Sequence, residues 1–109
     1  MKKQTVIEKL VFGSPLSNED LTVNEYVNLQ NVDISSLPDD LTVLRTLNLN
    51  WTNISQLPTN LKVGKNLYIR GTEITELPND LIVRGNVYTD KAQLSYIPEH
   101  LESKIRICI

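Results

Sequence analysis

The residues of this chain best suited to covalent or acid–base chemistry are one histidine, His100, and one cysteine, Cys108. Zinc sites and nucleophile–base pairs need several such groups at set spacings, and the sequence offers neither residue a partner of that kind. Reactive thiols also need a neighbouring base or cation. We therefore interpret His100 as an exposed turn residue and Cys108 as an inert thiol, whose one expected reaction is an intermolecular disulfide on oxidation.

Two pairs of carboxylates, Glu19-Asp20 and Asp39-Asp40, are the other groups that suggest chemistry. A calcium loop needs further oxygen ligands at fixed positions, and both pairs lie where turns are expected. The glycines Gly64, Gly71 and Gly85 are dispersed and match no phosphate-binding loop. We therefore expect no catalytic site, no metal site and no cofactor, and we predict that the protein is not an enzyme.

A repeat of twenty residues organises the chain and must position any site that it has. A leucine starts each unit, a valine follows two residues later in most of them, and a Leu-Pro or Ile-Pro pair comes near the end. Such periodicity is typical of a solenoid, in which each repeat forms one coil and stacks on the next. The leucines that start the units are Leu21, Leu41, Leu61, Leu81 and Leu101.

Each unit contains two stretches with the alternation of a β-strand. In the unit 61–80, apolar residues alternate with polar ones at Leu61/Val63 and again at Leu67/Ile69. Period two puts one face of a strand inward. The second stretch is the better candidate, and stacked copies of it predict one parallel sheet. Because the proline near the end of each unit favours a bend over a helix, the predicted fold class is mainly β, a single-domain solenoid with few or no helices.

The repeat also sets the expected boundaries within the domain. Residues 1–20 are less regular and are interpreted as an N-terminal cap, and residues 101–109 as a C-terminal half-coil that ends in a strand. Between them lie four repeats, 21–40, 41–60, 61–80 and 81–100. The fourth is the weakest copy, since Thr89 and Ala92 replace larger or more typical residues; drift and adaptation for contact are both open as reasons.

The pattern Leu67-x-Ile69-x-x-Thr72-x-Ile74-x-x-Leu77-Pro78, with its counterparts in the other units, resembles the leucine-rich repeat class. It is most similar to the short twenty-residue repeats of bacterial proteins, including secreted effectors and small phage-encoded proteins. The resemblance covers residues 21–109 and implies a coiled repeat with a parallel sheet and a protein-binding role. The family usually has an Asn that bonds backbone groups along the coil. Thr supplies part of that bonding and Val or Ala none, so a straighter, β-helix-like stack is the alternative to a curved horseshoe. The residues that replace the Asn are Val32, Thr52, Thr72 and Ala92.

Composition narrows the classes of partner. The net charge of −2 and the pI near 5.3 argue against the basic stripe that nucleic acid binding needs. No segment approaches the ~20 apolar residues of a membrane span. The start of the chain, Met1 to Thr5, is polar and unlike a signal peptide. We therefore expect neither a nucleic acid nor a membrane partner, and a cytoplasmic location, with which a single cysteine agrees.

The outward columns of the predicted sheet carry most of the aromatic residues. Three of the four tyrosines and the single tryptophan lie on or beside this face, and Trp, Tyr and Arg dominate interface hot spots. Gly71 would leave space beside Trp51. The alternative is that Tyr and Asn stack as same-face neighbours and only stabilise the sheet. The candidate partner-binding residues are Tyr26, Asn28, Asn48, Asn50, Trp51, Tyr68, Arg70, Tyr88 and Asp90.

The C-terminal half-coil is a second candidate surface. In the repeat alignment Leu101 takes the first position, Ile107 and Ile109 take the inward strand positions, and Cys108 shares the outward column of Tyr88. A bare terminal strand has unpaired backbone groups that invite pairing. Closed two-fold pairing would hide both edges, so a homodimer is expected. The candidate self-association residues are Ile105, Ile107, Cys108 and Ile109.

Two hypotheses about function follow from these surfaces. The leading one is a non-enzymatic protein–protein interaction module, by its resemblance a phage or bacterial inhibitor that binds and blocks a host protein through the sheet face. The alternative is a self-assembling structural protein that dimerises through its C-terminal strand.

Overall fold

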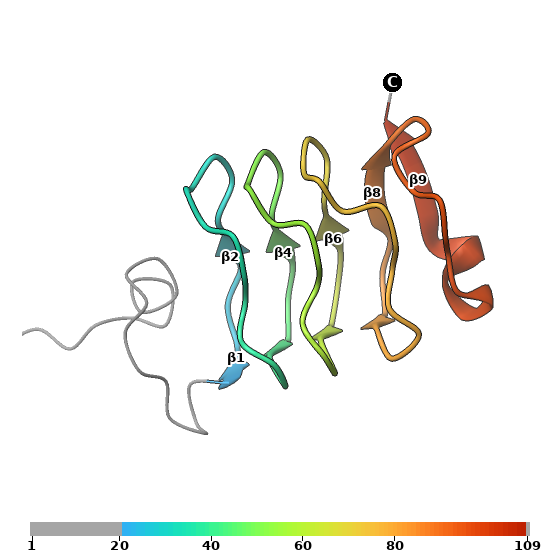
Figure 1. Cartoon of the computed structure of the whole chain (residues 1–109). Coiled ribbons are helices and arrows are strands. Elements are labelled where there is room, and N and C mark those ends of the chain that lie inside the picture. Colours follow the sequence, from blue (N-terminus) through green and yellow to red (C-terminus); the bar gives the residue numbers. More distant parts are fainter. Residues whose placement is uncertain (1–20, 109) are drawn as a thin grey trace, which may run out of the picture.

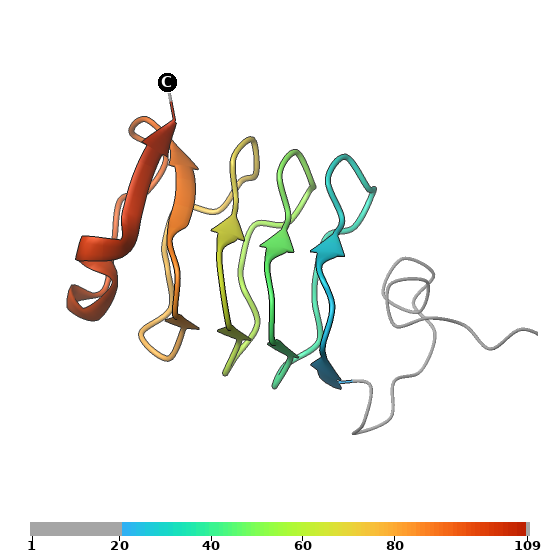
Figure 2. The same ribbon diagram turned by 180° about the vertical axis from the view of Figure 1, so that it is seen from behind.

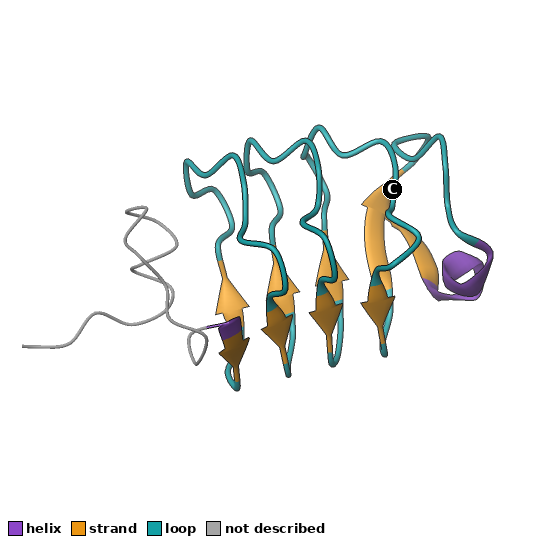
Figure 3. Ribbon diagram, turned by 60° about the horizontal axis from the view of Figure 1, so that its bottom comes forward, coloured by secondary structure: helices purple, strands orange, loops and turns teal. Residues whose placement is uncertain are grey.

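The computed structural model describes residues 21–108, which form a parallel β-solenoid of four stacked coils followed by one further strand (Figure 1). The strands lie along one side of the coils and irregular loops along the other (Figure 3). Helix is almost absent from this range, and its longest segment is the 3₁₀ helix η2 (Glu99–Lys104). The prediction of a mainly β, single-domain solenoid is therefore confirmed. The predicted cap, residues 1–20, and Ile109 lie outside the described residues.

The strands form two parallel sheets, in which residues from β1 to β8 pair with the residue twenty positions further along the chain. We expected one sheet, from the second alternating stretch of each repeat. The first stretch also pairs from coil to coil and adds a narrower sheet, because its Val side chains are buried in the same way. The first sheet contains β1 (Thr22–Val23), β3 (Thr42–Val43), β5 (Lys62–Val63) and β7 (Ile82–Val83). The second contains β2 (Val27–Asn28), β4 (Leu47–Asn48), β6 (Leu67–Tyr68), β8 (Val87–Asp90) and β9 (Ile105–Cys108), seen side by side in Figure 2.

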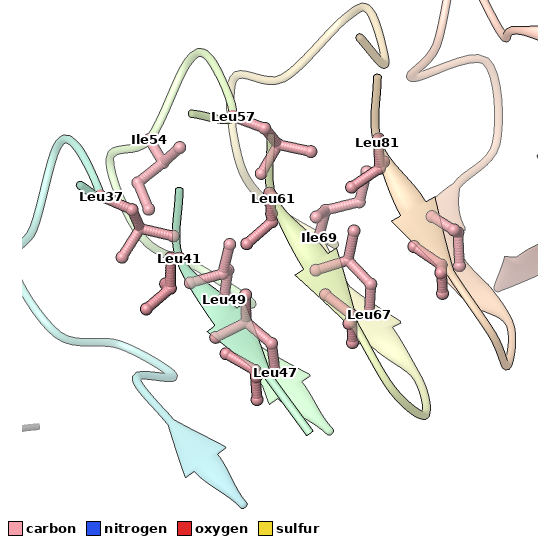
Figure 4. Packing of buried hydrophobic residues seen from close by; sticks show 14 of the residues in the cluster. Leu37, Leu41, Leu47, Leu49, Ile54, Leu57, Leu61, Leu67, Ile69 and Leu81 are labelled. Carbon is pink, nitrogen blue, oxygen red and sulfur yellow. The ribbon is translucent and has the colours of Figure 1, made fainter. Parts of the chain in front are cut away.

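The inward residues of the repeat form aliphatic columns that run through the coils (Figure 4). In the third coil the leucine that starts the unit, Leu61, and the inward pair of the second stretch, Leu67 and Ile69, are fully buried. Because the coils are related by an unbroken twenty-residue period, each such residue packs against its own counterpart above and below. The regular repeat thus produces one continuous core between the strands and the loops.

The first sheet ends one coil before the second, because η2 replaces the first strand in the last coil. Within that sheet the amide of Lys62 donates to the Leu41 carbonyl at 3.0 Å, and the amide of Ile82 donates to the Leu61 carbonyl at 3.1 Å. At the next step His100 Nε2 lies 2.8 Å from the Leu81 carbonyl oxygen. The only histidine therefore caps a sheet edge, where an unpaired carbonyl would invite another strand.

The register of β9 differs from the one that we expected. Ile105 pairs with Val87, and Cys108 pairs with Asp90. The alignment with Tyr88, predicted for Cys108, belongs to Arg106 instead. The strand starts two residues early because it follows directly from η2, without the intervening turn of the other coils. A shift of two residues keeps the same side chains on the inner face, so the strand was correctly predicted and its column was not.

The end of each second-sheet strand turns through a residue in the left-handed backbone region. Asn31, Trp51 and Gly71 have φ of 64°, 62° and 69°. In the fourth coil this conformation falls on Ala92, one residue later than the repeat predicts, with φ 61°. The weak fourth copy therefore contains a shifted turn.

The threonines at positions 52 and 72 form hydrogen bonds to the backbone of their own coils. The Thr52 hydroxyl donates to the Leu49 carbonyl at 2.8 Å, and the Thr72 hydroxyl donates to the Ile69 carbonyl at 2.7 Å. These bonds stay within one coil, as expected for the short side chain. In the fourth coil the corresponding position is taken by Gln93, whose backbone amide closes the shifted turn onto Asp90 at 3.2 Å.

Candidate functional site

The outward face of the second sheet, here called the sheet face, brings the predicted partner-binding residues together. The pairing places Asn28, Asn48, Tyr68 and Tyr88 in one column across four strands. The rings of Tyr68 and Tyr88 stack with centroids 4.6 Å apart and planes 9° from parallel. Partial burial raises the pKa of the Tyr68 hydroxyl, and the Tyr88 hydroxyl adds to this effect. The two rings thus form one flat aromatic platform.

Trp51 lies beside this platform in an unusual conformation. It is 53% exposed, and its φ of 62° is in the left-handed region, which bulky residues rarely adopt. Its indole lies over the backbone of Gly71, where an added Cβ would come within 1.9 Å of a ring carbon. The space that we expected beside Trp51 is therefore occupied by the tryptophan ring itself, which a glycine supports from below.

A second interaction fixes the same glycine. Asp90 accepts hydrogen bonds from Arg70 Nε at 2.9 Å and from the amide of Gly71 at 2.8 Å. The bond from Arg70, and then the bond from the Gly71 amide, holds the pKa of the Asp90 carboxyl below its ordinary value. The same pairing raises the pKa of Arg70. Asp90 therefore ties the fourth coil to the third and anchors the peptide on which the indole rests.

We expect this pair to make stability depend on acid. Since the pKa of Asp90 is lower in the folded protein, its contribution is present above the unfolded pKa and is lost as the pH falls through the folded value. Urea unfolding should show that Asp90→Asn costs more stability at neutral pH than at pH ~3. The effect will be modest because both side chains are about a third exposed. An equal cost at both pH values would mean that the ionised carboxylate contributes nothing.

The asparagines Asn48 and Asn50 of the sheet face form hydrogen bonds that stabilise the sheet. Asn48 is only 7% exposed, and its amide donates to the Tyr26 hydroxyl at 3.2 Å and to the Gln30 side chain at 3.1 Å. Its carbonyl oxygen accepts from the amide of Asn50 at 3.0 Å, and Asn50 in turn accepts from the amide of Arg70 at 2.8 Å. For these residues the structure favours the interpretation that they stabilise the sheet. The surface free for a partner is therefore aromatic and charged.

The sequence alignment missed Arg106, which continues the column of Tyr88. Its Nη1 atom donates to the carbonyls of Ser103 and Ile105, each at 3.0 Å, so its head turns back toward η2. Cys108 lies one column over, opposite Asp90, and is half-buried. The sequence does contain a pattern that favours a helix after Pro98, with the acidic Glu99 in its first turn and the basic Lys104 in its last. Allowing for that helix would have moved the predicted register of β9.

The candidate self-association residues lie on the last strand. Ile105 packs against the core, whereas Ile107 is 51% exposed. On one side β9 pairs with β8, and within residues 21–108 nothing pairs with its other edge. This edge is the surface that a second copy would need, and Ile109 falls outside the described range.

The remaining chemical candidates have structural partners. Asp39 accepts from the amide of Thr59 at 2.9 Å, and Asp40 accepts from the Asn60 side chain at 3.1 Å, so this pair joins turns of neighbouring coils. Glu19-Asp20 lies outside the described residues. Between residues 21 and 108, no three side chains of the metal-binding types lie close enough to hold an ion. No helix in that range is long and apolar enough to cross a membrane.

No protein-family model matches the chain, and neither the curated proteins nor the solved structures that were compared with it gave a match.

Proposed function

We propose that the protein is a non-enzymatic interaction module that binds another protein through the sheet face, centred on Trp51, Tyr68, Arg70 and Tyr88. The observation that carries the proposal is Trp51, an exposed indole held over Gly71 in a left-handed conformation. Such a conformation costs about 1–3 kcal/mol for a residue other than glycine. Asn31, in the same column, is of a residue type that adopts this conformation at lower cost.

The surroundings of Trp51 suit a hot spot. Hot spots are rigid aromatic or arginine side chains that bury large area with little loss of conformational entropy. Here the indole is supported by a glycine, the two tyrosine rings are stacked, and Arg70 is held by Asp90. The site is therefore organised before a partner arrives, which lowers the entropic cost of binding.

The resemblance to short bacterial and phage repeats supports a narrower form of the proposal. In that form the protein is a cytoplasmic inhibitor that binds a host protein and blocks it. The geometry of the sheet face supports binding of a protein, whereas the inhibitory role is supported only by the resemblance.

The test compares capture from a bacterial extract by the wild type, Trp51→Asn and Tyr96→Ala, each first checked for folding by circular dichroism. Asn suits the left-handed position, so Trp51→Asn removes the indole and leaves the backbone unstrained. Tyr96→Ala is the matched control, because Tyr96 is 46% exposed on the loop side. We expect one protein to bind the wild type and the control, and to bind Trp51→Asn at least about tenfold more weakly. Equal capture by all three would contradict the proposal.

A second candidate function is self-assembly through the edge of β9, supported by the exposed Ile107. Sedimentation at a concentration on the order of tens of micromolar should then show a dimer for the wild type and a monomer for Ile107→Lys. A wild-type monomer at that concentration would remove this candidate.

A further inference from the structure

The outer face of the first sheet contains a hollow that the sheet-face proposal does not use. It has a volume of about 490 Å³. It lies over β3, β5 and β7, the strands in the lower row of Figure 1. The side chains and the glycine that line its outer surface are Thr42, Leu44, Lys62, Gly64, Ile82 and Arg84.

Gly64 creates the hollow. The pairing of Val43, Val63 and Val83 puts the residues that follow them, Leu44, Gly64 and Arg84, in one column. The amide of Gly64 donates to the Val43 carbonyl at 2.7 Å, and an added Cβ would meet the Leu44 carbonyl oxygen at 2.3 Å. The middle coil therefore has no side chain here, and the column has a gap between Leu44 and Arg84.

The walls of the hollow are aliphatic. Leu44 is 46% exposed and Ile82 is 47% exposed, although both lie on strands or turns whose neighbouring valines are buried. The outward positions of the first coil are polar, with Thr22 opposite Thr42 and Asn24 before the turn. Two exposed aliphatic side chains beside a gap form a place where one further aliphatic side chain would be removed from water.

Two basic side chains, Lys62 and Arg84, are among the residues that line the hollow. The segments 42–46, 62–66 and 82–86 contain four cations and no carboxylate, in a chain whose net charge is −2. Lys104 Nζ adds a fifth, since it donates to the Arg84 carbonyl at 3.1 Å. Five of the eight lysines and arginines between residues 21 and 108 thus belong to these segments or contact them, and the only ion pair in that range is Arg70–Asp90, on the other sheet. These five are Arg45, Lys62, Lys65, Arg84 and Lys104, of which Lys62 and Arg84 line the hollow itself.

We propose that this hollow binds an acidic segment of a partner protein, with one aliphatic side chain of that segment inserted between Leu44 and Ile82. Lys62 and Arg84 supply charge complementarity, which speeds association and selects the partner. The aliphatic walls supply the anchor. The site is distinct from the sheet face, so either can fail while the other holds.

The walls favour a peptide over the two other anionic partners, nucleic acids and anionic membranes. Nucleic acids present phosphates, and single strands bind through aromatic stacking as well, whereas the aromatic platform of this protein lies on the second sheet. Anionic lipid surfaces need a larger apolar area than two side chains to hold a protein. A single aliphatic side chain between carboxylates matches both the size and the charge of the hollow.

The experiment uses fluorescence anisotropy of short labelled peptides with the full chain. The first peptide has a central Leu flanked by Asp and Glu, the second has Ser in place of that Leu, and the third keeps the Leu between Asn and Gln. We expect the first to bind most tightly and both others to bind at least about fivefold more weakly, with all binding to the first reduced by salt. Equal binding of the first two peptides would overturn the aliphatic anchor.

Matched variants locate the site. Lys62→Glu/Arg84→Glu should weaken binding of the first peptide by about tenfold or more, whereas Lys91→Glu/Arg106→Glu, with the same change in net charge, should have little effect. All four residues are exposed, so the fold should survive. Leu44→Ser should reduce the affinity for the first peptide to that for the second. Equal weakening by both charge reversals would overturn the site, as would tighter binding of an oligothymidylate or of phosphatidylserine vesicles than of the first peptide.

Trp51→Asn separates this proposal from the sheet-face proposal. It should bind the first peptide as the wild type does, because Trp51 lies on the second-sheet side of the coil. If Trp51→Asn also loses the peptide, the acidic segment binds the sheet face and the proposal for the hollow is wrong.

Discussion

Replacing Gln93 with alanine is expected to lower the free energy of unfolding by about 2–4 kcal/mol, although the residue lies in a surface turn. Its side-chain amide donates to the carbonyls of Ile69 at 2.8 Å and Ile74 at 3.1 Å and to the Thr72 hydroxyl at 3.0 Å. Its carbonyl oxygen accepts from the Thr89 hydroxyl at 2.7 Å. One side chain therefore serves several polar groups beside the core.

The geometry of the other coils explains why this side chain is needed. In the second and third coils a backbone amide reaches the coil before it: Asn53 donates to the Ile34 carbonyl at 3.2 Å, and Glu73 donates to the Ile54 carbonyl at 3.1 Å. The same step in the fourth coil would pair the amide of Gln93 with the Ile74 carbonyl. Because the turn is shifted by one residue, that amide bonds Asp90 instead, and the side chain of Gln93 replaces it.

Urea unfolding of Gln93→Ala and of Gln56→Ala measures this contribution. Gln56 is an exposed loop residue of the second coil, so its substitution should change stability by less than about 0.5 kcal/mol. A double-mutant cycle with Thr89→Val makes the test sharper. Thr89 is 1% exposed in a position that Leu49 and Ile69 occupy in other coils. Valine there removes the hydroxyl that Gln93 satisfies, so the cost of Gln93→Ala should fall in that background. Equal effects of Gln93→Ala and Gln56→Ala would show that the network contributes nothing.

Gln93 also marks what could and could not be predicted from the sequence. The column Asn28–Tyr88 was predictable because a twenty-residue period without insertions fixes which residues pair. The shifted turn at Ala92 was not predictable. Thr89 and Ala92 differ from the repeat pattern without indicating a new structure, and Gln93, which contacts Thr89, is not one of the positions that the pattern defines. A buried threonine and a nearby long amide side chain are informative together, and only the backbone shows that they meet.

The last strand and the contact of Trp51 with Gly71 show the same limit. The last strand was predictable from its alternation, and its register was not, because η2 consumes residues that form a turn elsewhere. The contact of Trp51 with Gly71 was only partly predictable. The twenty-residue period places the two residues next to each other, but the left-handed φ that turns the indole onto the glycine is seen only in the backbone. Periodicity thus predicts which residues are neighbours, and local departures from it decide what they do.

Gly71→Ala is expected to cost about 2–4 kcal/mol, from two separable causes. Alanine at a φ of 69° is strained by about 1 kcal/mol. Its Cβ would also lie 1.9 Å from a ring carbon of Trp51, so the indole must leave its place, and such overpacking costs about 1–3 kcal/mol. The Gly71 amide that donates to Asp90 is unchanged by the substitution, so that bond is not part of the expected loss.

Measuring the same substitution in the Trp51→Asn background separates the two causes. Without the indole the collision disappears, and Gly71→Ala should then cost only about 1 kcal/mol. Trp51 is the only tryptophan, so the emission of the wild-type protein reports its position directly, and displacement of the ring should shift that emission in Gly71→Ala. If the sheet face binds a partner through an indole held in place, Gly71→Ala should weaken capture although Trp51 itself is intact. An equal cost in both backgrounds, with unchanged emission, would mean that the glycine supports the turn and not the tryptophan.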